Sequence, residues 1–225
     1  MNLSIYGNQS DVLTTSRGAE IAVQQAGDLD LMAMDFTRNR SSPFALDVGC
    51  GAGDQAVRLA QEGASVLATD IVDMSQAVAA AVAKAPDLRG TVSFNRLDMR
   101  NLDALLLASF ADIIVCQRAI HYCSFYEAID VIASFKQALK RDGRLYLSAC
   151  GMESELGQSY PGTTVALDHR HERLDAAMRV KYDIHAPVCL YREQEIIHLI
   201  FTGGLVPEKV FVCAAGNINL VAKHG

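Results

Sequence analysis

The sequence predicts an α/β fold in which a mainly parallel β-sheet carries helices on both faces. Short apolar runs rich in β-branched residues alternate with helix-like segments from residue 44 onward. A glycine-rich turn directly follows the first of these runs. Repeats of strand and helix at this spacing are typical of parallel sheets that are buried on both sides. The chain has 225 residues, 50% of them hydrophobic, which fits one globular domain.

The individual elements follow from the apolar pattern. Strands are expected at residues 44–48, 65–70, 91–98, 111–117 and 143–150, and helices between them at 54–63, 75–86, 102–110 and 124–140. Asp73 stands where it caps the second helix, and Pro86 stands where it ends it. Ser124 and Glu127 form the capping-box pattern at the start of the last helix. Gly143 suits a turn just past that helix.

The flanking segments complete a single domain over residues 1–225. Residues 1–40 predict a helical N-terminal cap, and residues 44–150 the cofactor-binding core. Residues 151–190 lack a clear period and are interpreted as an inserted lid. Residues 191–225 contain one helix and two strand-like runs around a glycine turn, which predict a terminal hairpin.

The composition indicates a cytoplasmic protein that acts on neither membranes nor bulk nucleic acid. The formal net charge of −6 disfavours non-specific binding to nucleic acid or anionic lipid. No apolar run approaches the roughly 18 residues needed to span a bilayer. The start, MNLSIYGNQS, lacks the pattern of a secretion signal. The 6 cysteines are scattered without a C-x-x-C pair, which indicates buried thiols in a reducing compartment. A homodimer is an open alternative to a monomer.

The stretch ALDVGCGAGD at residues 45–54 predicts a nucleoside site without a phosphate. A dinucleotide fingerprint reads G-x-G-x-x-G, but here Asp54 occupies the place of the third glycine. A pyrophosphate at the start of the next helix would be repelled by Asp54 and by Asp47 before the loop. A cationic nucleoside such as S-adenosylmethionine fits these charges, and Asp70 ends the second strand where a ribose-binding carboxylate is expected.

Five motifs in order resemble the class I S-adenosylmethionine-dependent methyltransferases. They read DVGCGAG, ATD, FNRLDMRNL, DIIVCQRAIHY and LKRDGRLYLS. The resemblance covers about residues 44 to 150 and returns in the terminal hairpin. It implies a Rossmann-like sheet of seven strands in the order 3-2-1-4-5-7-6, with strand 7 antiparallel, and S-adenosyl-L-methionine as cofactor.

The resemblance also implies which residues bind the cofactor. Its methionine portion would contact the glycine loop and the end of the fourth strand, its ribose the end of the second strand, and its adenine the end of the third. These residues are Asp47, Gly49, Gly51 and Gly53 for methionine, Asp70 for ribose, Asp98 and Met99 for adenine, and Gln117 at the methionine end; Cys50 and Ile71 are further cofactor-binding candidates. Other interpretations stay open: the acids as solvated strand ends, Met99 as packing, and Asp54 as a charge that complements the helix dipole.

The acceptor side is expected beyond the fourth strand, in QRAIHYCSFY. His121 and Tyr122 are the candidate catalytic residues, with His121 as a general base whose unperturbed pKa is near 6.5. A backbone-bonding His121 and a pocket-wall Tyr122 are the structural alternatives. Candidate substrate residues are Arg118 and, from the N-terminal cap, Tyr6 and Arg17.

The stretch HRHERLDAAMRVK at residues 169–181 carries two further possibilities. Its excess of arginine and lysine predicts either a basic face that attracts an acidic acceptor or an ordinary solvated helix face. Its His169-x-His171 pair resembles a metal site, but no acidic cluster accompanies it, so no metal is expected.

The predicted function is methyl transfer to an O or N atom of a small molecule. An RNA or protein methyltransferase is the first alternative. An RNA acceptor is disfavoured because no appended RNA-binding module is visible in the sequence. An NAD(P)-linked oxidoreductase is disfavoured by Asp54 and by the lack of a Tyr-x-x-x-Lys type pair. A non-catalytic S-adenosylmethionine-binding protein is a third alternative.

Overall fold

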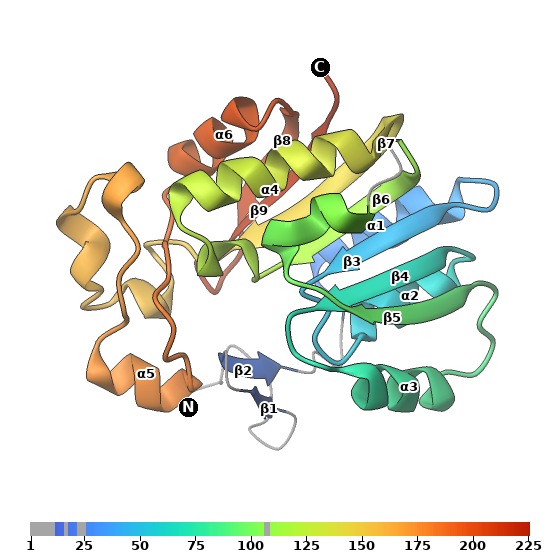
Figure 1. Cartoon of the computed structure of the whole chain (residues 1–225), viewed down its shortest axis with the longest axis horizontal. Helices are drawn as coiled ribbons and strands as arrows, with labels where there is room; N and C mark the ends of the chain where they lie inside the picture. Colours follow the sequence, from blue (N-terminus) through green and yellow to red (C-terminus); the bar gives the residue numbers. More distant parts are fainter. Residues whose placement is uncertain (1–11, 16–17, 22–25, 106–108) are drawn as a thin grey trace.

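The computed structural model describes residues 12–15, 18–21, 26–105 and 109–225. Seven strands form one sheet in the order β5-β4-β3-β6-β7-β9-β8 (Figure 1). The strands are β3 (Phe44–Val48), β4 (Ser65–Asp70), β5 (Thr91–Arg96), β6 (Ala111–Gln117), β7 (Leu139–Ala149), β8 (Val206–Val212) and β9 (Ile218–Lys223). Six strands run in one direction, and β9 alone runs opposite to them. This confirms the predicted order 3-2-1-4-5-7-6 with strand 7 antiparallel.

The helices pack on the sheet as two layers, each with its own apolar core. One core joins the sheet to α1 (Asp28–Arg38), α2 (Asp54–Gln61) and α3 (Ser75–Lys84). The other joins it to η2 (Met99–Leu105), α4 (Phe125–Ala138) and α6 (Glu193–Thr202). Successive residues of β6 enter opposite cores, Ile113 and Val115 one of them, Ile114 and Cys116 the other. Burial on both faces explains why this strand reads as an unbroken apolar run.

The capping box of α4 is present, but the following strand begins earlier than predicted. Ser124 N donates to Glu127 Oε2 over 2.8 Å, and Glu127 N donates to Ser124 Oγ over 3.4 Å. The predicted helix at 124–140 ends at Ala138, because Leu139 already pairs with Ala111 of β6. The predicted turn at Gly143 is wrong, since this residue lies within β7.

The N-terminal cap is only partly helical. Residues Val12–Thr15 (β1) and Gly18–Ile21 (β2) form an antiparallel hairpin, and α1 follows it. The expectation of helix is therefore wrong for this hairpin, whose run VLTT is rich in residues that favour strands. Tyr6 and Arg17 lie outside the described residues.

Residues 151–190 form a small unit that begins at the carboxyl edge of the sheet, directly after β7. It consists of η4 (Glu155–Gly157), η5 (Pro161–Thr164), η6 (Leu167–His169) and α5 (Ala176–Tyr182), and it lies to one side of the sheet in Figure 1. A third apolar cluster holds it together, with Leu156, Leu174 and Leu190 at its centre.

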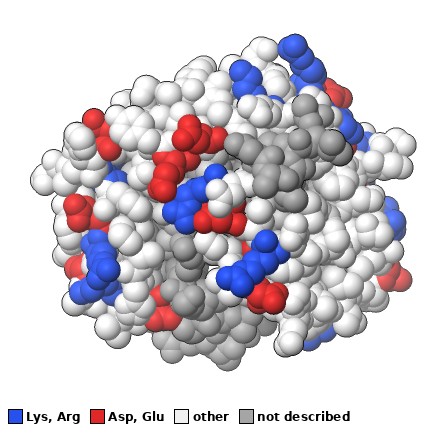
Figure 2. Space-filling view, in the orientation of Figure 1, with Lys and Arg blue, Asp and Glu red and all other residues white. Residues whose placement is uncertain are grey.

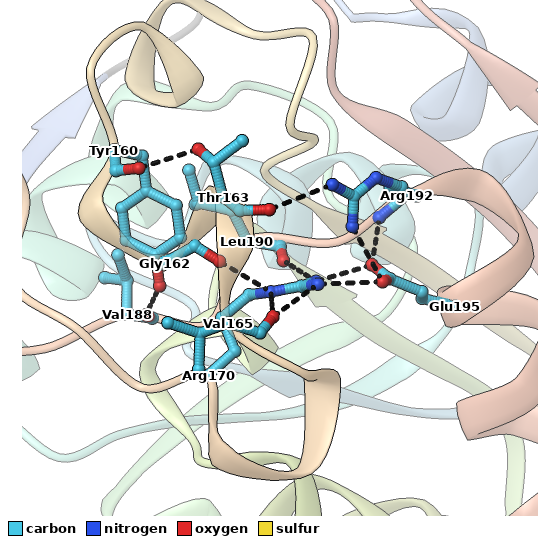
Figure 3. Close-up of polar contacts among 9 residues, drawn as sticks. All are labelled: Tyr160, Gly162, Thr163, Val165, Arg170, Val188, Leu190, Arg192 and Glu195. Atoms are coloured by element: carbon cyan, nitrogen blue, oxygen red, sulfur yellow. Dashed lines mark hydrogen bonds and ion pairs between the residues drawn. The ribbon is translucent and has the colours of Figure 1, made fainter.

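Arg170 organises this unit from within (Figure 3). Its side chain is 3% exposed and donates to the carbonyls of Gly162, Val165 and Leu190 and to both carboxylate oxygens of Glu195 in α6. Lys181 pairs in turn with Glu155. Neither interpretation of the stretch 169–181, a basic face or a solvated helix face, holds for Arg170, whose charge is buried and paired rather than exposed.

Two further sequence expectations concern the cysteines and membrane-spanning helices. Five of the cysteines are buried free thiols and Cys213 is partly exposed, in line with the predicted buried thiols. Within the described ranges, each helix is too short or too polar to cross a membrane.

Candidate active site

The glycine loop between β3 and α2 has a backbone that needs glycine. Gly49, Gly51 and Gly53 have φ of 69°, 52° and 87°, a region that other residues rarely adopt. A Cβ on Gly49 would stand 2.6 Å from the Ala119 Cβ. The loop is also tied to β4, because Gly49 N and Cys50 N both donate to Thr69 O, over 2.8 and 3.0 Å. The result is a turn that is fixed against the end of β4.

Asp70 joins this loop to the end of β4. Its Oδ2 accepts a hydrogen bond from Gly51 N over 3.1 Å, and its Oδ1 accepts one from Val72 N over 2.9 Å. The next residue, Ile71, uses its carbonyl to accept from Arg96 Nε over 3.0 Å. The structure therefore brings the predicted ribose carboxylate into contact with the predicted loop.

Asp98 and Met99 stand at the end of β5, on the side expected for adenine. Both carboxylate oxygens of Asp98 accept from the guanidinium of Arg100, which also pairs with Glu127. Hydrogen bonds from Arg100 to Asp98 raise the pKa of that guanidinium further above its usual range. The Met99 methyl lies 3.9 Å from where a Gly49 Cβ would stand, so the adenine side is continuous with the loop.

A cavity of about 270 Å³ opens between the glycine loop, the start of α1 and the turn between β8 and β9. Five of its lining residues are predicted site residues, namely Asp47, Gly49, Cys50, Gln117 and Arg118. Sequence reasoning missed other polar residues of this lining: Asp30, Gln55, Ser148, Asn217 and Asn219. Of these, only Gln55 carried a local signal, its place just after the loop.

Asp30 fixes Gln117 at the wall of the cavity. Gln117 Nε2 donates to Asp30 Oδ1 over 2.5 Å, and Gly27 N donates to Asp30 Oδ2 over 2.8 Å. Asp30 is 7% exposed and lies in the first turn of α1, where a carboxylate complements the helix dipole. Because the amide nitrogen of Gln117 is engaged, its carbonyl oxygen is the atom left to face a ligand.

Arg118 follows β6 in a strained conformation. Its φ is 50°, and its backbone N donates to Ser148 O over 2.9 Å and to Ser148 Oγ over 3.1 Å. Such left-handed residues are rare outside glycine and cluster at functional sites. The two bonds to β7 hold Arg118 at the junction of two strand ends.

His121 and Tyr122 are not among the residues that line this cavity. The His121 ring is 2% exposed, and its Nε2 lies 3.7 Å from Cys150 Sγ. The Tyr122 ring packs against it at 4.6 Å between centroids. Desolvation, aided by the charge of Arg118, lowers the pKa of His121 to about 3. An activity profile with a midpoint near 6.5 therefore does not apply to this buried ring.

Comparison with known proteins places the glycine loop and its strands in a family. Residues 45–143 match the model of the methyltransferase domain family. A curated protein of Geobacillus sp. (strain WCH70) named as a methyltransferase is 35% identical over 101 residues, which is 44% of this chain and 39% of that protein. The chain thus matches about two fifths of that relative's length. Residues 45–143 therefore match a methyltransferase domain.

Solved structures share the fold of this methyltransferase domain and its flanking elements. A methyltransferase of Methanosarcina mazei matches with a TM-score of 0.66 at 19% identity, over 85% of this chain and 96% of that one. Magnesium protoporphyrin IX methyltransferase of Synechocystis PCC 6803 gives 0.58 at 18%, over 91% and 90%. The 1,6-didemethyltoxoflavin-N1-methyltransferase of Burkholderia thailandensis gives 0.61 at 16%, over 88% and 79%. At these identities the likeness establishes the fold.

The His169-x-His171 pair stands apart from the methyltransferase site. His171 Nε2 lies 3.3 Å from Tyr122 O, and the His169 side chain is 78% exposed. In the part of the chain that the structure describes, no group of three or more His, Cys, Asp or Glu residues is arranged to hold a metal ion.

Proposed function

We propose that this protein transfers a methyl group from S-adenosylmethionine to an O or N atom of a small-molecule acceptor. The observation that carries this proposal is the 3.1 Å hydrogen bond from Gly51 N to the Asp70 carboxylate. It unites a glycine cradle with an acid that has lone pairs left for a ribose diol. The cradle fits the cofactor, because a side chain on Gly49 would close it.

The charges around the cradle favour a cationic ligand over a dinucleotide. Asp47 and Asp54 both line the cavity, and Asp54 opens α2 where a pyrophosphate would otherwise bind. Asp30 adds a third carboxylate, buried in the wall. A sulfonium and an ammonium group are stabilised by such carboxylates, whereas a diphosphate is repelled.

We assign the binding roles as follows. The loop residues Asp47, Gly49, Cys50, Gly51 and Gly53, together with the Gln117 carbonyl, hold the methionine portion; Asp70 and Ile71 hold the ribose; Asp98 and Met99 hold the adenine. Arg118, Tyr6 and Arg17 are the proposed acceptor contacts. The Asp98 carboxylate shares its lone pairs between Arg100 and the adenine amino group.

Bound S-adenosylmethionine supplies a methyl group that the acceptor lone pair takes up, while the C–S electron pair stays on sulfur and the acceptor proton leaves. The chain's task is to hold the acceptor atom about 3 Å from that methyl group. His121 and Tyr122 are the candidates for proton removal. Because the pKa of His121 is lowered to about 3, it is a weak base and fits an acceptor that is already acidic.

The acceptor class rests on the fold neighbours and on the cavity. Two of the neighbours are named for small-molecule acceptors, a protoporphyrin and a toxoflavin precursor, and both were solved with the demethylated cofactor bound. A cavity of about 270 Å³ suits a molecule of modest size. We further propose a cytoplasmic enzyme without a nucleic-acid partner, as a monomer or homodimer. An RNA or protein acceptor is the alternative.

Calorimetry with S-adenosylhomocysteine and NADH tests the cofactor assignment. The parent should bind S-adenosylhomocysteine and gain thermal stability from it, and should ignore NADH. The Asp70→Ala variant should lose at least roughly tenfold in affinity, about 1.4 kcal/mol, because two charge-assisted hydrogen bonds to the ribose are removed. Asp73→Ala, three residues away in an exposed turn, is the matched control. Binding of NADH alone would overturn the proposal.

A further inference from the structure

The cavity beside the glycine loop holds an unusual share of the protein's buried polar groups. Six of the twelve polar or charged side chains that are buried in the described part of the chain line it: Asp30, Asp47, Gln55, Ser148, Asn217 and Asn219. They come from both helices next to the loop, from three strands and from the turn before β9. Buried polar groups are costly to a fold unless they are paired, so their convergence on one cavity indicates a ligand.

Among these side chains, the two uncharged amides of Gln55 and Asn217 each have a buried atom without a hydrogen-bond partner in the described part of the protein. One is Gln55 Nε2, a donor, and the other is Asn217 Oδ1, an acceptor. Their residues are 8% and 7% exposed. Buried polar atoms almost always have a partner, so each of these is explained by a ligand group of the opposite kind.

The Gln55 side chain and the Asn217 backbone are each held by a neighbouring hydrogen bond. Arg58 Nη1 donates to Gln55 Oε1 over 3.5 Å, which turns the amide nitrogen of Gln55 away from Arg58. Asn217 O accepts from Cys213 N over 2.9 Å, which fixes the turn between β8 and β9. The unpaired donor and the unpaired acceptor therefore come from two separately anchored walls of the cavity.

The charges of the lining limit what enters. Four carboxylates, those of Asp28, Asp30, Asp47 and Asp54, face two guanidiniums, those of Arg58 and Arg118. An anionic ligand is disfavoured by this excess of negative charge. Phe211 adds an apolar ring to the same lining, which suits the flat face of a heterocycle.

We propose that the methyl acceptor is an uncharged heterocycle with a cyclic amide, whose carbonyl accepts from Gln55 Nε2 and whose N–H donates to Asn217 Oδ1. This rests on the proposed function and deepens it, since it assigns the acceptor's class and two residues that select it.

Three ligands with the same bicyclic ring and different substituents test the proposal by calorimetry or ligand-observed NMR on protein saturated with S-adenosylhomocysteine. The first, 2-quinolone, offers the cyclic amide; 2-methoxyquinoline lacks the N–H; quinoline-2-carboxylate is an anion. The parent should bind 2-quinolone at least tenfold more tightly than either of the others. Equal binding of 2-methoxyquinoline, tighter binding of the carboxylate, or no binding of 2-quinolone would overturn the proposal.

Two variants locate the contacts. Gln55→Met and Asn217→Leu keep side-chain size and remove the unpaired atoms, so each should weaken 2-quinolone binding about tenfold. Without ligand, their Tm should equal or exceed that of the parent, because an unsatisfied buried group has been removed. Asn101→Leu, on the exposed surface, is the control.

The cofactor readout separates this proposal from the proposed function. Both variants should bind S-adenosylhomocysteine as the parent does. A parallel loss of S-adenosylhomocysteine affinity would show that the two amides belong to the methionine subsite, and the acceptor assignment would be wrong. If the parent itself fails to bind S-adenosylhomocysteine, the proposed function fails first.

Discussion

The cofactor core, residues 44–149, and the unit at 151–190 are ordered in different ways. In the core, paired strands satisfy one another's backbone groups in a regular register. In the unit, short 3₁₀ turns leave carbonyls that side chains must satisfy: Ser154 Oγ donates to Gly151 O over 2.6 Å, and the Tyr160 hydroxyl donates to Val188 O. The backbone hydrogen bonds that hold the core are therefore shared among many residues, whereas a few side chains supply those that hold the unit at 151–190.

The largest loss of stability is expected at Arg170, the side chain that makes the most of these hydrogen bonds in the unit. Arg170→Ala removes the buried guanidinium that binds three carbonyls and Glu195 (Figure 3), so these acceptors lose their buried side-chain donor and Glu195 keeps only its bonds to Arg192. We expect a loss of about 3 kcal/mol in the free energy of unfolding, measured by urea denaturation. Cleavage by a protease should begin within 151–190, because the core keeps its own hydrogen bonds.

Arg173→Ala is the matched control, since Arg173 belongs to the same basic stretch but is exposed. Its stability should stay within about 0.5 kcal/mol of the parent. Equal effects of the two substitutions would contradict the central role of Arg170 and the contrast between the two regions. Figure 2 shows that lysines and arginines stand beside acidic side chains over this face of the molecule, rather than in one basic patch.

In the core, the next largest loss of stability is expected from a substitution in the glycine loop rather than in a strand. Gly49→Ala introduces a methyl group 2.6 Å from the Ala119 Cβ at a φ of 69°. Gly63→Ala, at a φ of 102°, meets nothing within 4 Å. We expect losses of about 2–3 kcal/mol for Gly49→Ala and about 1 kcal/mol for Gly63→Ala, because only the first adds a clash to the backbone strain.

Calorimetry then distinguishes the two glycines by function. Gly49→Ala should lose S-adenosylhomocysteine binding, whereas Gly63→Ala should keep it. If both variants lose the same stability and both bind the ligand, close approach of the loop is not what requires glycine at position 49.

The same contrast explains what the sequence could and could not predict. The prediction gave the observed bounds for three strands, 44–48, 65–70 and 111–117. Strands that are buried on both faces appear in the sequence as continuous apolar runs, which makes them easy to recognise. The place of Asp70 at the end of the second strand was predicted and is observed, but its hydrogen bond to the loop was not predicted. The sequence around Arg170 does not indicate that Glu195 is its ion-pair partner, because Glu195 lies 25 residues away and in a different element.

The cavity shows the same limit. Asp30 and Asn217 come from opposite ends of the described chain and meet there only through the sheet order. Asp30 was not among the predicted site residues, and its bond to Gln117 spans 87 residues. Periodicity and spacing describe residues that are close together along the chain. They therefore could not predict which side chains meet through tertiary structure.

His121 lies where the two regions meet and gives the smallest predicted effect. Its carbonyl accepts from Cys189 N over 2.8 Å, and its ring is buried beside Cys150. Because burial lowers the pKa of His121 from 6.5 to about 3, the folded protein binds fewer protons there than the unfolded chain between these values. Stability from this group is therefore full above pH 6.5 and falls as the pH drops below it.

This sign gives a test by denaturation at several pH values. Between pH 6.5 and pH 5, His121 should account for about 1.5 kcal/mol of lost stability in the parent, since each unit of separation is worth about 1.4 kcal/mol. His121→Gln should remove that part of the pH dependence, and the exposed control His198→Gln should retain it. Turnover, once an acceptor is known, should show no step near pH 6.5 that His121→Gln abolishes. Such a step would mean that the ring is charged in the working enzyme and acts as a base at the acceptor, so that the core and the unit open around it during the reaction.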